Sequence, residues 1–406
     1  MNAPSIDISF IEKGISAVTR SERGIVMLWV KDALPPFLKN PITVVTESDI
    51  PEALQESTVE QVKLAMAGYT NAPKKVLVYC MDISTGGETG IHTDTEETEV
   101  NTEETVTNTV EAGYKKAMEA SETIKFDYLA VPTVQTDGKA EDVAVWVKSM
   151  RGNKKKKIKA VLPDTPADNE GVINFTTAEM VKTETVTNKD GTKSIKETTY
   201  TAEQYCSRIA GLIAGTPATI SCTYAPLPEL SDCTRLTDID TPVGKGEFIL
   251  FYDGEKVKVV IGVNSFVTTI DGKGESFKKI KIVEAMDMIH DDITKTAQDS
   301  YLGKYANSYS NKCLLLSAIN SYFAQLSADG IVSSYSVALD AEAVRIYLKG
   351  KGLQATLDDG RGGIVKDVDE CSDEEIITAD TGSSVFMVAN VKILDAIENI
   401  KMPVYI

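Results

Sequence analysis

Short apolar segments alternate with amphipathic helical segments in the first half of this chain, and this rhythm constrains the fold more than any other feature. The apolar, β-rich runs are residues 25–30, 42–45, 76–80, 128–131 and 158–162. Between them, apolar side chains recur at helical spacing, as at Val59, Val62 and Met66 or at Val143, Trp146, Val147 and Met150. Strands that are apolar on both faces are typical of a parallel sheet covered on both sides and joined by right-handed crossovers. The sequence therefore predicts a mainly parallel α/β domain.

Two segments interrupt this rhythm. Residues 85–109 are rich in Thr and Glu with few large apolar side chains, which is typical of a solvent-exposed loop. Residues 180–200 alternate polar and β-branched side chains around Asp190-Gly191, which indicates a surface hairpin. Both are predicted to be surface insertions that add little to the core and are dispensable for folding.

The 406 residues exceed one ordinary core, so we expect two domains. A helix over residues 202–214 leads into a passage marked by Pro217, Pro226 and Pro228, and we place the domain boundary after it, near Leu236. Beyond it we expect a hairpin of residues 247–251 and 256–261, two amphipathic helices between residues 280 and 326, and strands at residues 336–339, 343–348 and 385–393. The predicted organisation is an arm (1–20), an α/β domain (21–235), an α+β domain (236–396) and a second arm (397–406).

Both ends of the chain are expected to be extended arms. Ile6, Ile8 and Phe10 alternate with polar residues, and Val404 and Ile406 do the same at the other end. Free terminal segments are usually polar, whereas an apolar alternating segment can complete the edge of a sheet. That edge belongs either to another molecule or to the arm's own domain, and the pattern does not choose between them.

Composition excludes several classes of protein. The net charge of −18 argues against binding to nucleic acid, whose phosphates attract basic surfaces. The start of the chain lacks the features of a secretory leader, and no apolar run is long enough for a membrane span. The six cysteines form no closely spaced Cys/His pairs, so free thiols in a reducing cytoplasm are expected and a zinc site is not.

No catalytic, cofactor or metal site is expected. None of the Gly-Lys dipeptides is followed by Ser or Thr, as a phosphate loop requires, and there is no Gly-x-Ser-x-Gly nucleophile elbow. Of the two histidines, His92 lies in the Thr/Glu-rich segment and His290 lies beside Asp287, Asp291 and Asp292. We interpret that acidic group as a solvated helix face rather than a weak metal site. The run of lysines at residues 154–157 is interpreted as solvated, with an acidic neighbouring molecule as the alternative partner.

Several phrases, taken in order, resemble the contractile phage tail sheath family of Gram-positive phages and phage-like bacteriocins. They are PSIDISFIEKG, FDYLAVPT, KAVLPDTPADNEGVINF, YCSRIAGLIAGTPATISCTY, GEFILFYDGEKVKVVIGVNS, FKKIKIVEAMDMIHDDI and VFMVANVKILDAIENI. The resemblance implies a central domain that is subtilisin-like in fold only, since no protease triad can be assembled here. It implies no enzyme activity and no cofactor.

The resemblance further implies a helical sheath that surrounds an inner tail tube, contracts, and drives the tube through the envelope of the target cell. Its implied partners are other copies of the chain, joined through Ile6, Ile8, Phe10, Val404 and Ile406, and the tube, baseplate and tail terminator proteins. Its implied location is the tail of a virion or phage-like particle that is assembled in the bacterial cytoplasm. Two alternatives stand beside it: an α/β enzyme that handles nucleotides or sugars, which the parallel-sheet pattern alone supports, and a surface-layer protein, which the missing export signal disfavours.

Overall fold

The computed structural model describes residues 17–81, 83, 102–187, 192–358 and 363–405. The chain divides into two compact units. One, called here the α/β unit, comprises Glu22–Asp287 and Asp395–Ile406; the other, called the second unit, comprises Met288–Leu394 and Met1–Ser21. Helix α6 (Ile280–Thr296) begins in the α/β unit and ends in the second unit. The domain boundary near residue 236 stays a prediction.

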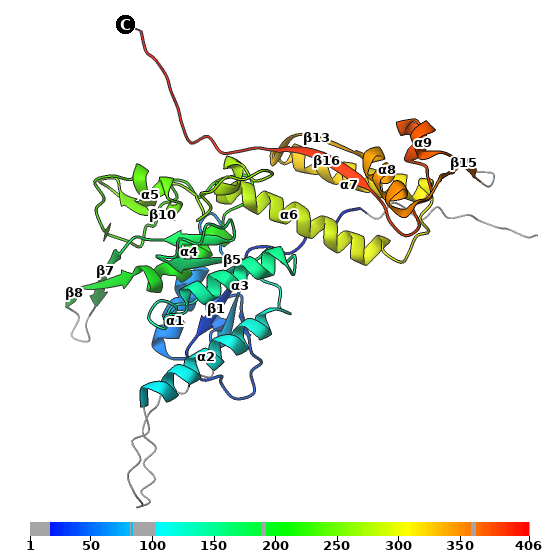
Figure 1. The fold of residues 1–406 in the computed structure, drawn as a ribbon. Helices are drawn as coiled ribbons and strands as arrows, with labels where there is room; N and C mark the ends of the chain where they lie inside the picture. Colours follow the sequence, from blue (N-terminus) through cyan, green and yellow to red (C-terminus); the bar gives the residue numbers. More distant parts are fainter. Residues whose placement is uncertain (1–16, 82, 84–101, 188–191, 359–362, 406) are drawn as a thin grey trace, which may run out of the picture. The chain divides into compact units, whose positions relative to one another are not determined.

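A seven-stranded sheet, which includes the strands labelled β1 and β5 in Figure 1, forms the centre of the α/β unit. Its strand order is β10-β6-β5-β4-β1-β3-β2. Its strands are β1 (Ile25–Val30), β2 (Ile42–Val44), β3 (Lys75–Cys80), β4 (Tyr128–Ala130), β5 (Lys159–Pro163), β6 (Val172–Phe175) and β10 (Glu247–Phe248). Every pairing is parallel except that of β2 with β3. The prediction of a mainly parallel α/β architecture is confirmed.

Helices cover both faces of this sheet because alternate side chains of each strand point to opposite faces. Val26 and Leu28 of β1 lie in one buried cluster with residues of α1 (Glu56–Met66) and α4 (Ala202–Ala214). Met27 and Trp29 lie in another with residues of α2 (Thr102–Ser121) and α3 (Ala140–Gly152). The continuous apolar strands are thus explained by two hydrophobic layers rather than one.

Both predicted insertions differ from the prediction in the residues that join them to the rest of the α/β unit. Helix α2 begins at Thr102, so the prediction of a loop for residues 102–109 is wrong; residues 84–101 lie outside the described residues. The second insertion is the antiparallel hairpin of β7 (Glu179–Thr187) and β8 (Lys193–Thr201), with its turn at residues 188–191 outside the described residues. Its outer part is exposed, but Met180 and Tyr200 at its base are buried in the core, which the alternating pattern did not reveal.

The hairpin predicted after the proline-marked passage is present but shorter than expected. It consists of β11 (Leu250–Tyr252) and β12 (Val257–Val259), paired antiparallel. Glu247–Phe248 forms β10 instead, and pairs in parallel with β6 as the last strand of the large sheet. The short helix α5 (Asp240–Gly244) precedes it, and β9 (Asp232–Cys233) pairs with β7.

The second unit combines helices with two small antiparallel sheets. It contains the end of α6, α7 (Tyr309–Ala328), β13 (Val332–Leu339) paired with β16 (Met387–Ile393), α8 (Ala341–Lys351), β14 (Ala355–Leu357) paired with β15 (Ile364–Lys366), and α9 (Asp373–Ile376). Side chains of α8, β14 and α9 share a small buried core. This agrees with the expected α+β character.

Residues 343–348 form a helix within α8, so their prediction as a strand is wrong. The β-branched and aromatic side chains there suggested a strand, but Asp340 caps the helix by accepting a hydrogen bond from the Ala343 N–H (2.9 Å). Gly352 ends it in the left-handed conformation (φ 65°). Val344 and Leu348, four residues apart, are the buried positions, which is the helical spacing.

Candidate assembly interface

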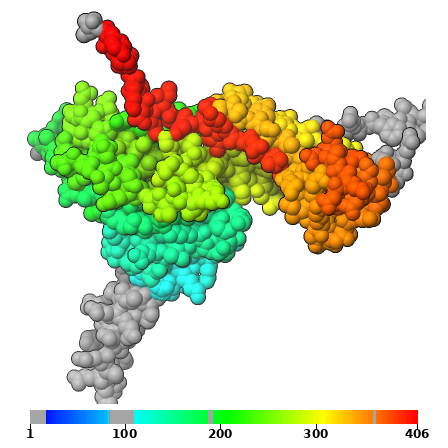
Figure 2. Space-filling view, turned by 45° about the horizontal axis from the view of Figure 1, so that its top comes forward, coloured from blue at the N-terminus to red at the C-terminus, as the bar shows by residue number. Residues whose placement is uncertain are grey.

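The described part of the C-terminal arm is extended and exposed. In Figure 2 the red end of the chain is a narrow segment open to solvent. Val404 is 71% exposed and Tyr405 is 92% exposed. Of the other predicted arm contacts, Ile6, Ile8, Phe10 and Ile406 lie outside the described residues, so the structure does not place them.

Contacts of Lys279 and Thr223 fix the point at which this arm leaves the α/β unit. Lys279 forms ion pairs with Asp395 and with Glu398 (2.7 Å to the latter), and the Thr223 hydroxyl donates to Glu398 at 2.8 Å. Burial opposes the charge of Lys279, but the two carboxylates outweigh it and raise its pKa. Apolar side chains beyond this anchor, including Ile400, are mostly exposed.

The sheet of β13 and β16 is a two-stranded antiparallel sheet in the second unit. Its two strands pair from Val332 with Ile393 to Leu339 with Met387, and each has a single partner among the described strands. Helix α7 packs beside β13, and Phe323 stacks on Tyr335 with ring centroids 5.8 Å apart. A strand that has no neighbour on one side presents, along that side, a row of backbone N–H and C=O groups that can pair with another chain. Both outer edges of this sheet therefore offer a template for an added strand.

An apolar cavity of about 510 Å³ lies in the second unit next to this sheet. Its lining includes Tyr301, Leu315, Ile319, Phe323, Val337, Val385, Met387 and Val388. The lining comes from the end of α6, from α7 and from both strands. It is a place where apolar side chains of an added segment can be buried.

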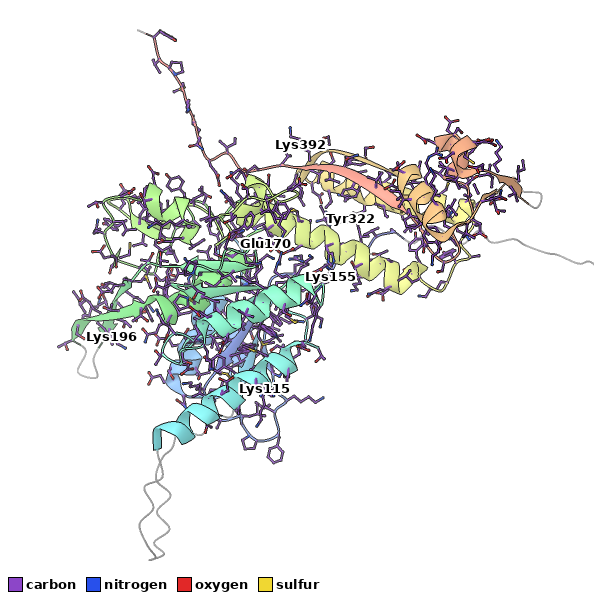
Figure 3. All side chains as sticks on the ribbon, viewed as in Figure 1. Lys115, Lys155, Glu170, Lys196, Tyr322 and Lys392 are labelled. Carbon is purple, nitrogen blue, oxygen red and sulfur yellow. The ribbon has the colours of Figure 1, made fainter. Side chains whose placement is uncertain are left out.

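The N-terminal segment is held on α6 within the second unit. The Ser21 N–H donates to Asp292 (2.6 Å) and the Thr19 N–H donates to the Thr296 hydroxyl (3.1 Å). Traced backward from Ser21 to Thr19, the chain therefore approaches the C-terminal end of α6, beyond which Tyr301 lines the cavity. Asp292 is fully buried and also accepts a hydrogen bond from Tyr322 of α7 (2.7 Å), a residue labelled in Figure 3.

The acidic residues of α6 are not a solvated face, so that interpretation is wrong for Asp287 and Asp292, which are 3% and 0% exposed. Asp287 accepts two hydrogen bonds from the Arg151 guanidinium, both of 2.9 Å, and pairs with Lys159 at 2.8 Å. A paired carboxylate can be buried where an isolated one cannot. His290 is half-buried beside Asp291 (3.1 Å), and His92 lies outside the described residues.

Glu284, one turn before Asp287, belongs to the same buried group of charges. It accepts hydrogen bonds from Arg23 (2.8 Å), Lys159 (2.7 Å) and the Tyr128 hydroxyl (2.7 Å). Burial by itself would raise the pKa of Glu284, but Arg23 and Lys159 outweigh it and hold that pKa well below the ordinary glutamate value. These contacts attach the first half of α6 to the α/β unit.

The sequence analysis did not predict the buried cations that pair with Glu284 and Asp287, although the position of Lys159 could have indicated them. It is a lysine inside an otherwise apolar strand and is 1% exposed. A charged side chain at such a position needs a buried partner of opposite charge. In the lysine run before it, Lys154 and Lys155 are exposed as expected, whereas burial lowers the pKa of the half-buried Lys157.

Among the residues that the structure describes, no group of three or more His, Cys, Asp or Glu side chains is arranged to hold a metal ion. All six cysteines are free, five of them buried and Cys313 partly so, as expected. Among the described helices, none has the length and apolar character that crossing a membrane requires.

Comparisons with known proteins agree on one family. The family model for the phage tail sheath protein central domain matches residues 107–265, and that for the phage tail sheath C-terminal domain matches residues 272–359. The tail sheath protein of Clostridium phage phiCD119 is 32% identical over 403 residues, which cover 98% of each chain.

Two solved structures share the fold. The sheath tail protein of Desulfitobacterium hafniense has a TM-score of 0.64 at 18% identity, covering 96% of this chain and 100% of that one. The helical sheath of the anti-feeding prophage in its contracted state has a TM-score of 0.58 at 14% identity, covering 100% and 99% of the two chains. Together with the near full-length sequence match, the fold leads to one conclusion: this chain belongs to the phage tail sheath protein family.

Proposed function

We propose that this chain is a structural subunit of a contractile tail sheath, which polymerises helically around an inner tail tube and contracts to drive the tube through the target cell envelope. Membership of the sheath family supports the structural and contractile parts of this proposal. Its other proposed partners are the tube, baseplate and tail terminator proteins, and its proposed location is the tail of a particle assembled in the host cytoplasm. The subtilisin-like character of the α/β unit is proposed for the fold alone, without catalysis.

The observation that carries the assembly mechanism is the open β13–β16 sheet. We expect terminal arms of neighbouring subunits to add strands to its edges through backbone hydrogen bonds. An added strand would present alternate side chains toward the cavity beside the sheet, which suits the alternation of Ile6, Ile8 and Phe10 and of Val404 and Ile406.

Such contacts join different surfaces of identical subunits, so they can repeat from one subunit to the next, and they build a filament where the rotation between subunits does not close a ring. Arms held by backbone pairing would also keep neighbours connected while the compact units rotate as rigid bodies during contraction. The anchors at Asp292 and at Lys279 would fix the points where the two arms begin.

The test is to remove residues 1–10 or residues 401–406 and to examine the purified proteins by negative-stain electron microscopy. Each truncation should leave a monomer that melts like the full chain, because both anchors remain, and each should abolish regular tubes. Tubes formed by either truncated protein would refute arm exchange for that arm. Unfolding on truncation would instead show that the arm completes its own subunit.

A further inference from the structure

The N-terminal arm joins the second unit beside its apolar cavity. The Thr19 N–H donates to the Thr296 hydroxyl in the last turn of α6 (3.1 Å). Ala297, the next residue of the chain, lines the cavity. The anchored end of residues 1–16 therefore lies next to a wall of the cavity in its own subunit.

The arm is long enough to enter that cavity. The nine residue steps from Phe10 back to its anchor at Thr19 span up to about 30 Å when extended. A short tether of this kind gives the arm an effective concentration on the order of 1 mM at its own cavity. The arm of another subunit reaches the same cavity only at the concentration of the protein in solution. In dilute protein the subunit's own arm is therefore the favoured occupant.

The apolar side chains around the cavity are incompletely covered in the described part of the chain. Leu302 is 67% exposed, and Val385 and Val388 are each 40% exposed. An apolar segment that covers them is stabilised by the burial of its own side chains and theirs. Alternate residues of an extended segment share one face, and the apolar ones in this arm are Ile6, Ile8 and Phe10.

A buried lysine lines the same cavity. Lys312 is 4% exposed, and its ammonium donates to the Ala379 carbonyl at 2.9 Å. Burial lowers the pKa of Lys312, and the charges of Asp380 and Asp358 offset this only in part. Glu12 falls on the same face of an extended arm as its alternating apolar residues. An arm laid in the cavity can therefore bring a carboxylate to an ammonium that is otherwise costly to bury.

We propose that, before assembly, the N-terminal arm of each subunit occupies the cavity of its own second unit. The contact keeps dilute subunits monomeric, because the site for a neighbour's arm is already filled, and polymerisation requires the arm to leave. The proposal rests on the proposed function, in which the arms are exchanged between subunits. It adds to that function an internal inhibitor of assembly.

The test measures how a fluorescently labelled peptide of residues 1–16 binds to monomers at submicromolar concentration. A chain that lacks residues 1–10 should bind this peptide at least about tenfold more tightly than the full chain, because a cavity filled nine-tenths of the time loses that factor in apparent affinity. Tenfold corresponds to about 1.4 kcal/mol, so this truncation should lower the melting temperature by only a few degrees.

Two controls separate occupancy of the cavity from other effects of shortening the chain. A chain that lacks residues 401–406 keeps its N-terminal arm and should bind the peptide as weakly as the full chain. A peptide that carries Ile6→Ser, Ile8→Ser and Phe10→Ser should bind weakly to every chain, because it has lost the apolar face.

A second measurement locates the arm in the full chain. A photoreactive benzophenone amino acid in place of Phe10, in a dilute mixture of light and heavy-isotope monomers, should give crosslinks within one chain to peptides of α7 or β16. Equal affinity of the peptide for the full chain and the chain without residues 1–10, no binding to either, or crosslinks only between chains or away from the cavity would overturn this inference. Failure of the concentrated wild-type chain to form tubes would contradict the proposed function instead, and the monomer measurements would still decide where the arm lies.

Discussion

The carboxylates of Glu284 and Asp287 show how single residues connect α6 to the α/β unit. Both accept hydrogen bonds from cations that lie on other elements, and Lys159 touches both, at 2.7 and 2.8 Å. Burying charges in this way adds little net stability, but removing one partner leaves the others uncompensated and is strongly destabilising. The importance of these residues therefore appears only when one of them is removed.

We predict that Glu284→Gln lowers the free energy of unfolding by about 3 kcal/mol at pH 7, because Arg23 and Lys159 lose the charge that they share. The pKa of Glu284 is lowered in the folded state, so its contribution is complete above the unfolded value of ~4.3 and is lost as the pH falls through the folded value. Urea unfolding at pH 7 and at pH 3 should therefore show a smaller difference from the wild type in acid. The control Glu275→Gln removes an exposed ion pair with Lys278 and should cost less than about 1 kcal/mol. Equal effects of the two substitutions would contradict the role of Glu284.

At the scale of the element, the open edges of the β13–β16 sheet can be tested with proline. Successive N–H groups along a strand point to opposite edges, so of Asn390→Pro and Val391→Pro one removes a hydrogen bond to β13 and the other an outward N–H. We expect the variant that loses the hydrogen bond to β13 to have a markedly lower melting temperature. The variant that loses the outward N–H should melt close to the wild type and yet fail to form tubes in electron micrographs. Two variants that both assemble normally would show that the edge next to β16 is not used.

The β7–β8 hairpin provides a second test at this scale. Replacing residues 184–196 by Asn-Gly joins Thr183 to Glu197, which already face each other in the hairpin. Because the removed part is exposed, the melting temperature should change by only a few degrees. Met180→Ala, at the buried base, should instead cost about 2–5 kcal/mol in chemical unfolding. A large loss of soluble protein from the shortened hairpin would refute the view that its outer part is dispensable.

For the whole molecule, arm exchange predicts that two differently defective chains form a single arm-to-sheet contact with each other but cannot grow into a polymer. A chain that lacks residues 401–406 keeps its open sheet, and the assembly-defective proline variant keeps its arm. Neither should form tubes alone. Their mixture should give heterodimers by analytical ultracentrifugation, because one arm and one sheet remain compatible, but it should give no tubes, because the contact cannot be repeated. Mixtures that remain monomeric would contradict exchange of the C-terminal arm.

Most of the strands and helices of the α/β unit could be predicted from local patterns in the sequence. The apolar runs at residues 25–30 and 76–80 and the helix at residues 202–214 follow from side-chain periodicity, and all three are present in the structure. Periodicity is a property of neighbouring residues, so it needs no knowledge of the rest of the chain. The order of the sheath-like phrases along the sequence determined the family for the same reason, since it too is read along the chain.

The structure alone decided which distant side chains meet. Periodicity could not show that Asp287 and Lys159, 128 positions apart in the chain, form an ion pair, and it therefore assigned that aspartate to solvent. It also could not show that Met180 is buried beneath an otherwise exposed hairpin, or that residues 343–348 prefer a capped helix to a strand. In each case the outcome depends on burial against other elements, and the free energy of burial is a property of the packed molecule rather than of any one segment.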